Sequence, residues 1–332
     1  MSEATQRYAV VTGANKGIGL ETVKQLASNG INVVLTARDE KRGLEAFEKL
    51  KEFDLCGQVV FRQLDVSDPV SAASLADFIK TQFGKLDILV NNAGISGLLL
   101  DPDAFARAAE LAGGWPGEPK YWDEISKQSY ELAEECLQIN YYGAKRMVET
   151  LLPLLQLSDS PTVINISSDL GMLEHIPGEW AKEILSGVEK LTEEGVDEVV
   201  TEFLKDFKEG NLETKGWPTY ISAYKVSKAA MNAHTRILAK KYPHICVNSV
   251  CPGYVKTDIT CNTGLLTVTE AAQLLVARWN KATTETYELA EECLQINYYG
   301  AKRTADALIP LLQLSDSPRI VNVASSIAKL EL

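Results

Sequence analysis

Short apolar runs alternate with longer amphipathic stretches over the first 95 residues. The apolar runs are rich in β-branched residues; they are Tyr8–Thr12, Ile31–Thr36, Val59–Leu64 and Leu86–Asn91. The amphipathic stretches between them are Gly19–Asn29, Glu40–Lys51 and Val70–Phe83. Strands without polar alternation are buried on both faces, and helices between them cross over from one parallel strand to the next. The pattern therefore predicts an α/β fold with a Rossmann-type doubly wound parallel sheet.

The alternation resumes in the second half of the chain, where two long inserts interrupt it. The resumed elements are a helix near Tyr130–Leu157, a strand Thr162–Ser167, a helix Ala223–Lys241 and a strand Ile245–Val250. The first insert, Ser96–Gln128, is rich in Gly, Pro and Trp, and the second, Met172–Thr219, is mostly charged. Each insert follows a strand, at the edge where such sheets bind ligands. We expect a single domain whose inserts wall a substrate pocket, with passive surface decoration as the other interpretation.

The end of the chain repeats an earlier segment at a constant offset of 157 residues. Tyr287–Arg303 is identical to Tyr130–Arg146, and Pro310–Pro318 is identical to Pro153–Pro161. A solenoid needs about three or more repeats, so this is a duplication. We expect a catalytic domain over 1–283, followed by a helix–strand copy of about residues 127–175 over 284–332. The copied strand, Arg319–Val323, either extends the sheet beyond Ile245–Val250 or belongs to a poorly packed tail.

Composition excludes several classes of protein. The 33 basic and 45 acidic side chains give a net charge of -12, so no basic stripe is available for nucleic acid. No apolar run approaches about 18 residues and no secretory signal opens the chain, so we expect a cytoplasmic protein without a membrane span. Six cysteines without a CxxC pair and three scattered histidines predict no metal site.

A glycine-rich turn follows the first predicted strand. It reads Thr12-Gly13-Ala14-Asn15-Lys16-Gly17-Ile18-Gly19 and opens a helix. Glycines permit a tight turn and a close approach of the backbone, and the N–H groups of the helix N-terminus then face a pyrophosphate. The spacing is GxxxGxG, which differs from the GxGxxG fingerprint. Its place after a strand predicts that Gly13, Asn15, Lys16, Gly17, Ile18 and Gly19 bind a dinucleotide.

The end of the second predicted strand indicates which dinucleotide. A site for NAD carries an acidic residue there to hold the ribose 2′-hydroxyl. The strand ends in Arg38 instead, and Asp39 comes one place later. Arg38 and Lys16 are placed to pair with a 2′-phosphate, Arg38 through a bidentate fork. We therefore expect NADP(H). The other interpretation is that Arg38 and Lys16 are two solvated surface cations.

Weaker signals follow the third and fourth predicted strands. Asp65, with Val66 beside it, is expected to accept a hydrogen bond from the adenine amino group. Asn91-Asn92-Ala93-Gly94 comes after the fourth strand, where an amide can tie neighbouring strands and small residues admit the cofactor. We expect Asn92 to belong to the cofactor site.

Reduction of a carbonyl needs a proton for the developing alkoxide, and a tyrosine supplies one when a nearby cation lowers its pKa. Tyr and Lys four positions apart share a helix face. The chain has three such pairs: Tyr141/Lys145, Tyr224/Lys228 and Tyr298/Lys302. Context favours Tyr224/Lys228, which lies on the helix after the strand that ends in Asn165-Ile166-Ser167-Ser168.

Taken in order, these motifs resemble the short-chain dehydrogenase/reductase superfamily over about residues 7–280. The set is TGANKGIG, NNAG, Asn140, Ser168, Tyr224-x-x-x-Lys228 and Pro252-Gly253. The 56-residue gap between Ser168 and Tyr224 is long for the superfamily. Together with the helix sequences, it is similar to the plant salutaridine reductase and menthone/neomenthol reductase group and to monomeric carbonyl reductases.

The resemblance implies a role for each matching residue. Tyr224 would be the acid, Lys228 would lower its pKa and hold the ribose, Ser168 rather than Ser167 would bind the substrate carbonyl, and Asn140 would hold a water in a proton relay. Pro252, Gly253, Val255 and Thr257 would lie over the nicotinamide. The long insert would cover the dimerisation face of oligomeric relatives, which implies a monomer. The duplicate, with Asn297, Ser325 and Tyr298/Lys302, departs from the family and is expected to be catalytically silent.

These expectations combine into NADPH-dependent reduction of a bulky cyclic, terpenoid or alkaloid-like ketone. Aromatic residues of the two inserts are candidate pocket walls; they are Trp115, Tyr121, Trp122, Trp180 and Trp217. Ordinary packing explains each of them equally well. The competing hypothesis is a non-catalytic cofactor-binding pseudoenzyme or interaction protein.

Overall fold

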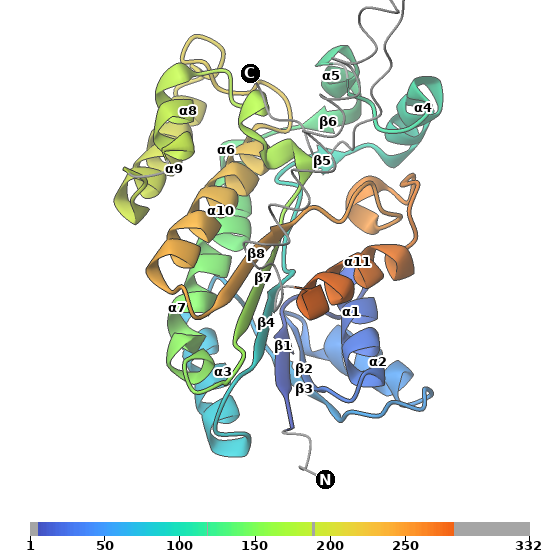
Figure 1. Cartoon of the computed structure of the whole chain (residues 1–332). Coiled ribbons are helices and arrows are strands. Elements are labelled where there is room, and N and C mark those ends of the chain that lie inside the picture. The colour runs from blue at the N-terminus through green and yellow to red at the C-terminus, as the bar shows by residue number, and fades with distance from the viewer. Residues whose placement is uncertain (1–5, 118, 188–189, 282–332) are drawn as a thin grey trace, which may run out of the picture. The chain divides into compact units, whose positions relative to one another are not determined.

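The computed structural model describes residues 6–117, 119–187 and 190–281. By its contacts the chain divides into two units, Met1–Trp279 and Asn280–Leu332. In the first unit, six parallel strands form one sheet in the order β3-β2-β1-β4-β7-β8 (Figure 1). These strands are β1 (Tyr8–Val11), β2 (Asn32–Ala37), β3 (Val59–Gln63), β4 (Ile88–Asn91), β7 (Thr162–Ile166) and β8 (Cys246–Val250). The doubly wound parallel sheet is confirmed.

Helices cover both faces of the sheet because alternate residues of each strand point to opposite sides. Val33 and Leu35 pack in one cluster, whereas Val34 between them packs in another. One face carries α1 (Gly17–Ser28), α2 (Glu40–Leu50) and α11 (Val268–Lys281), as Figure 1 shows. The other carries α3 (Pro69–Gln82), α7 (Ala144–Leu155) and α10 (Ser222–Lys241). Burial on both faces explains why the strands read as continuous apolar runs.

The helix predicted over Tyr130–Leu157 is confirmed, but its middle is π-helical, which the sequence did not predict. It consists of α6 (Tyr130–Leu137), a π-helical segment η2 (Gln138–Gly143) and α7. A Cβ atom at Gly143 would lie 2.8 Å from Val66 Cγ2, so glycine permits the close approach there. Single π-helical turns inside α-helices are frequent at functional sites, and this one contains Asn140.

Both inserts lie at the edge of the sheet formed by the carboxyl ends of the strands (Figure 1). The first follows β4 and comprises β5 (Leu99–Leu100), α4 (Pro102–Ala112), η1 (Pro119–Tyr121), α5 (Trp122–Ile125) and β6 (Ser126–Lys127). The second follows β7 and the short turn η3 (Asp169–Gly171), and comprises η4 (Leu173–His175), α8 (Glu179–Ser186) and α9 (Glu193–Lys208). None of the helices in the described part of the chain is long and apolar enough to cross a membrane. The strand expected at Arg319–Val323 and the duplicate's Asn297, Tyr298, Lys302 and Ser325 lie outside the described residues.

Candidate active site

Each predicted site residue except Asn140, Tyr224 and Lys228 follows the carboxyl end of one of the six parallel strands. In a parallel sheet these ends lie along one edge, so residues far apart in sequence gather there. Helix α10 brings Tyr224 and Lys228 to the same edge, and η2 brings Asn140. The sheet topology thus assembles the site.

Tyr224, Lys228 and Ser168 lie together between α10 and the end of β7. The Ser168 hydroxyl is close enough to the Tyr224 phenol to lower the pKa of that group. Lys228 Nζ lies 5.5 Å from the centroid of the Tyr224 ring and donates to the carbonyl oxygen of Ile166 at 2.7 Å. Gly171 permits this packing, because a Cβ there would lie 2.7 Å from Lys228 Cβ.

Asn140 is completely buried beside this group. Its Oδ1 accepts from the backbone N–H of Ile95 at 2.9 Å, and its Nδ2 donates to the Ile95 carbonyl at 3.0 Å. A Cβ at Gly94 would lie 3.3 Å from Asn140 Oδ1 and 3.7 Å from Lys228 Nζ. The structure therefore brings Asn140 and Lys228 together next to Gly94.

Burial sets the protonation of the tyrosine and the lysine. It raises the pKa of Tyr224 above its ordinary value, and the nearby Ser168 hydroxyl opposes that shift only in part. Burial also lowers the pKa of Lys228 to about 8. Near neutral pH Tyr224 is thus a protonated phenol beside a lysine that is still mostly charged.

The Tyr141/Lys145 motif is not part of this group. Tyr141 donates to the Asp197 carboxylate at 2.8 Å, and Lys145 pairs with the same carboxylate at 2.8 Å. This arrangement ties η2 and the first turn of α7 to α9 of the second insert. The Tyr298/Lys302 pair lies outside the described residues.

The glycine-rich turn joins β1 to α1 in the form that the sequence predicts. Gly13 and Gly17 have φ angles of +60° and +59°, which favour glycine. A Cβ at Gly13 would lie 2.8 Å from Ala93 Cα, and one at Gly19 would lie 2.4 Å from Asn92 Nδ2. The first turn of α1 has no acidic side chain, and its cap residue Lys16 cannot accept a hydrogen bond. The N–H groups of this turn are therefore available to an anion.

Asn92 ties the ends of two strands together. Its Nδ2 donates to the carbonyl oxygens of Thr12 and Gly13 at 2.9 and 3.0 Å. Thr12 completes the tie, because its Oγ1 accepts from the backbone N–H groups of Asn92 and Ala93, both at 3.0 Å. Thr12 is not among the site residues predicted from sequence, although its place directly before the first glycine of the turn is a usable signal.

Ser227 is a second residue of the site that was not predicted from sequence. Its Oγ accepts a hydrogen bond from Asn140 Nδ2 at 3.0 Å. It directly precedes Lys228, but the Tyr-x-x-x-Lys pattern leaves this position open. No signal in the sequence pointed to it.

The two cations expected at the 2′-phosphate are both exposed and paired. Arg38 Nη1 lies 3.2 Å from Glu135 Oε1, and Lys16 forms an ion pair with Asp258. The Asp39 carboxylate caps α2 by accepting from the backbone N–H of Arg42 at 2.9 Å. Asp39 is therefore engaged in holding the helix, which disfavours it as a ribose ligand.

The remaining predicted cofactor residues lie in loops at the same edge. Asp65 Oδ1 accepts from the backbone and the hydroxyl of Ser67, and Val66 is buried after β3. After β8, Pro252 and Val255 are buried, and Gly253 has a φ angle of +84°. Thr257 forms a capping box with Thr260, and its Cγ2 would lie 3.6 Å from a Cβ at Gly17. The β8 loop and the glycine-rich turn are therefore neighbours.

The five candidate aromatic walls separate into two groups. Trp115, Tyr121 and Trp122 belong to an apolar cluster that also contains Tyr224. Trp217 is 3% exposed, donates to Asp206 at 2.8 Å and packs edge-on against Trp180. Trp217 lies in a neighbouring cluster that Tyr224 also contacts, and Trp180 is 45% exposed. Packing of the second insert accounts for Trp217, and the assignment of Trp180 and Trp217 as pocket walls stays a prediction.

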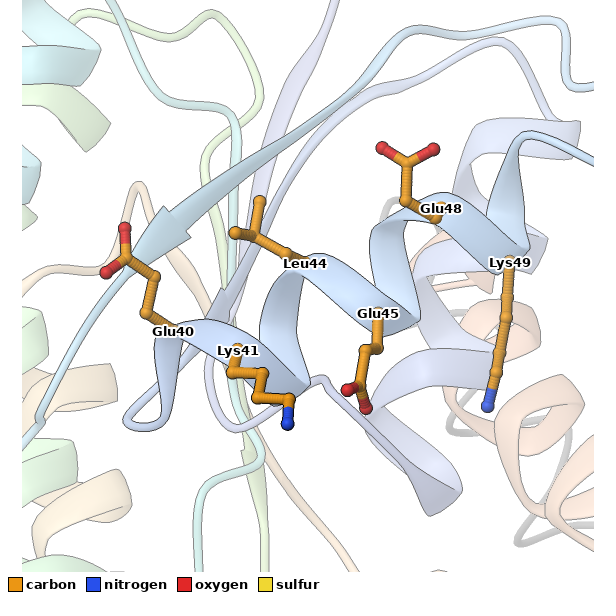
Figure 2. A pocket seen from close by; sticks show the side chains of 6 residues that line it. All are labelled: Glu40, Lys41, Leu44, Glu45, Glu48 and Lys49. Carbon is orange, nitrogen blue, oxygen red and sulfur yellow. The ribbon is translucent and has the colours of Figure 1, made fainter.

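Figure 2 shows a shallow depression on the outer surface of α2. Its lining residues are Glu40, Lys41, Leu44, Glu45, Glu48 and Lys49. They include none of the predicted site residues, so we assign no role to it.

Comparison with known proteins agrees with this geometry. A family model described as short chain dehydrogenase matches residues 7–179, and one described as Enoyl-(Acyl carrier protein) reductase matches residues 211–275. The (+)-neomenthol dehydrogenase of Arabidopsis thaliana is 58% identical, over 82% of this chain and 90% of that protein. Carbonyl reductase [NADPH] 3 of Mus musculus is 36% identical, over 80% of this chain and 88% of that protein.

A solved structure supports the same family assignment. Salutaridine reductase from Papaver somniferum superposes with a TM-score of 0.78 at 52% sequence identity, covering 82% of this chain and 95% of that one. The superfamily predicted from the ordered motifs is confirmed. The chain is an oxidoreductase and belongs to the short-chain dehydrogenase family.

Proposed function

We propose that this protein reduces a ketone to an alcohol with NADPH, through Asn140, Ser168, Tyr224 and Lys228. The observation that carries the proposal is the grouping of Tyr224, Ser168 and Lys228 at the same edge of the sheet as the glycine-rich turn, with Asn140 and Lys228 both next to Gly94. A phenol that burial keeps protonated suits the donation of a proton to a ketone oxygen.

The residues at the edge of the sheet fit NADP(H). The turn from Gly13 to Gly19 offers close backbone approach and free N–H groups to the pyrophosphate. Arg38 and Lys16 are held only by exposed carboxylates, and such ion pairs contribute about 1 kcal/mol or less, so a 2′-phosphate can replace them. Asp65, Val66, Asn92 and the loop from Pro252 to Thr257 complete the proposed site. When bound, NADPH supplies the hydride.

Each of the four side chains has its own role in protonating the ketone oxygen. Tyr224 donates its phenolic proton to that oxygen, and the Ser168 hydroxyl donates a hydrogen bond that holds it in place. The charged Lys228 stabilises the phenolate that is left on Tyr224. Asn140 Oδ1 already accepts from Ile95 and keeps a second lone pair for a water that returns a proton towards Lys228 and Tyr224.

The substrate class rests on the relatives and on the wall beside Tyr224. The neomenthol dehydrogenase and salutaridine reductase relatives are named for a terpenoid and an alkaloid. Trp115 and Tyr121, which are only partly buried in the cluster that contains Tyr224, give this chain an aromatic surface near its acid, which suits a bulky cyclic ketone. We further propose that the protein acts as a cytoplasmic monomer, and that 1–283 forms the catalytic domain with 284–332 as a silent duplicate.

The proposal is tested with the full-length protein, NADPH and a panel of cyclic ketones that includes menthone. Oxidation of NADPH that depends on the ketone, with a weaker response to NADH, is the expected result. Tight NADPH binding without turnover of any ketone would instead identify a cofactor-binding pseudoenzyme. Trp fluorescence on titration with NADPH measures that binding independently of turnover.

A further inference from the structure

Helix α10 begins in an unusual way three residues before Tyr224. The cap position is Ile221, whose φ angle of +50° places a β-branched residue in the left-handed region. Its aliphatic side chain cannot accept a hydrogen bond from the first turn, whose N–H groups have no partner within the helix. Because Ile221 is 3% exposed and Ser222 is fully buried, water is a poor substitute. Another group must therefore satisfy this helix end.

That group is the side chain of Gln128, the last residue of the first insert. Its Oε1 accepts from the backbone N–H of Ser222 at 2.8 Å and from the Ser222 hydroxyl at 2.7 Å. Its Nε2 donates to the carbonyl oxygen of Thr219 at 2.9 Å. One amide thus spans the strained residue Ile221 and contacts the chain on both sides of it.

We propose that Gln128 is a positioning residue that caps the helix of Tyr224 and so sets the place of its phenol. The proposal rests on the function proposed above, in which Tyr224 is the proton donor. Tyr224 lies in the first turn of α10, where a lost cap has its largest effect. Lys228 lies one turn further along and is held separately by the Ile166 carbonyl, so it keeps its place without Gln128. The first insert thereby acts on the acid through the first turn of α10.

Gln128→Ala tests the proposal. We expect kcat for the ketone to fall by roughly 10- to 100-fold, because a displacement of about 1 Å at a reacting group can cost about 100-fold. KM for NADPH should stay within about twofold, since the groups that hold the cofactor do not move. Gln128→Glu should restore most of kcat, because a carboxylate still accepts from both donors of Ser222 although it cannot donate to Thr219.

Thr192→Ala is the matched control. Thr192 caps α9 by accepting from the backbone N–H of Gly195, so this variant loses one helix cap far from the acid. It should lower the thermal midpoint about as much as Gln128→Ala does and leave kcat unchanged. The proposal is overturned if Gln128→Ala keeps its kcat, if Thr192→Ala loses kcat equally, or if Gln128→Glu is as slow as Gln128→Ala.

Tyr224→Phe, assayed beside them, separates this inference from the proposed function. If Tyr224→Phe keeps full activity, Tyr224 is not the acid and the proposed function fails along with the inference. If Tyr224→Phe is inactive while Gln128→Ala is normal, only the role of Gln128 is wrong.

Discussion

Lys228 Nζ donates a 2.7 Å hydrogen bond to the carbonyl oxygen of Ile166, the last residue of β7. Ser168 follows Ile166 by two residues, and Tyr224 precedes Lys228 by one helical turn. This one bond therefore joins the strand that carries Ser168 to the helix that carries Tyr224. The bond also holds the lysine charge near the Tyr224 phenol. Because Lys228 is buried there, its pKa is lowered to about 8.

Reduction should slow as the pH rises through about 8. Burial lowers the pKa of Lys228 to about 8, so the lysine loses its charge there, while Tyr224 stays protonated because burial raises its pKa. The measurement is kcat/KM for NADPH against pH, since this ratio reports groups of the free enzyme. Lys228→Arg keeps its charge over the whole range and should lack the decline, whatever its absolute rate. The same decline in Lys228→Arg would assign it to another group.

Arg38 should decide between the two dinucleotides. In Arg38→Ala we expect KM for NADPH to rise roughly 10- to 100-fold, because a hydrogen bond to a charged group contributes about 1.5–3 kcal/mol. KM for NADH should barely change, since NADH lacks the 2′-phosphate. Lys41→Ala removes a cation from the outer surface of α2 and is the control, with both constants unchanged. Equal losses with the two cofactors in Arg38→Ala would exclude a 2′-phosphate contact.

Two alanine substitutions separate backbone strain from contact in the glycine-rich turn. Gly13 and Gly30 both have positive φ, at +60° and +81°, so each substitution costs about 1 kcal/mol of strain. Gly13 would also bring its Cβ within 2.8 Å of the Ala93 backbone, whereas a Cβ at Gly30 has no described residue within 4 Å. Gly13→Ala should therefore lower the free energy of unfolding by about 1–3 kcal/mol more than Gly30→Ala, and weaken NADPH binding. Urea unfolding of both variants measures the difference, and equal losses would mean that the turn tolerates a side chain.

His234 should make the fold sensitive to acid. It is 3% exposed, its Nε2 has no hydrogen-bond partner among the described residues, and burial lowers its pKa from 6.5 to about 4. Between these two values the unfolded chain binds the proton and the folded chain does not, so stability falls as the pH falls through this range. The full loss is about 3 kcal/mol. Urea midpoints of the wild type and His234→Gln at neutral pH and near pH 4 test this expectation; an unchanged acid loss in His234→Gln would contradict it.

The sheet could be predicted from sequence because its signals are local. Apolar runs such as Ile31–Thr36 are buried on both faces, and a short run of this kind is typical of a central parallel strand. The gathering of Gly13, Asn92 and Ser168 then follows from the parallel topology alone. The Tyr224/Lys228 pair needed one further argument, its place after the strand that ends in Ser168.

What could not be predicted depends on contacts between distant segments. The π-helical turn at Asn140 forms where η2 meets Val66 and Ile95, which lie on other elements. Trp217 becomes a core residue because α9 supplies Asp206 as its partner. The left-handed Ile221 is likewise imposed from outside its own helix. Helical periodicity carries no information about any of these partners.

The most direct test of the account compares two tyrosines that share the same motif. Tyr224→Phe and Tyr141→Phe each remove one hydroxyl four residues before a lysine, but only Tyr224 lies beside Ser168. We expect Tyr224→Phe to lower kcat for the ketone by about 100- to 10,000-fold with NADPH binding retained. Tyr141→Phe should lose stability through its bond to Asp197 and keep its kcat. Full activity in Tyr224→Phe, or loss of kcat in Tyr141→Phe alone, would contradict the assignment of Tyr224 as the proton donor.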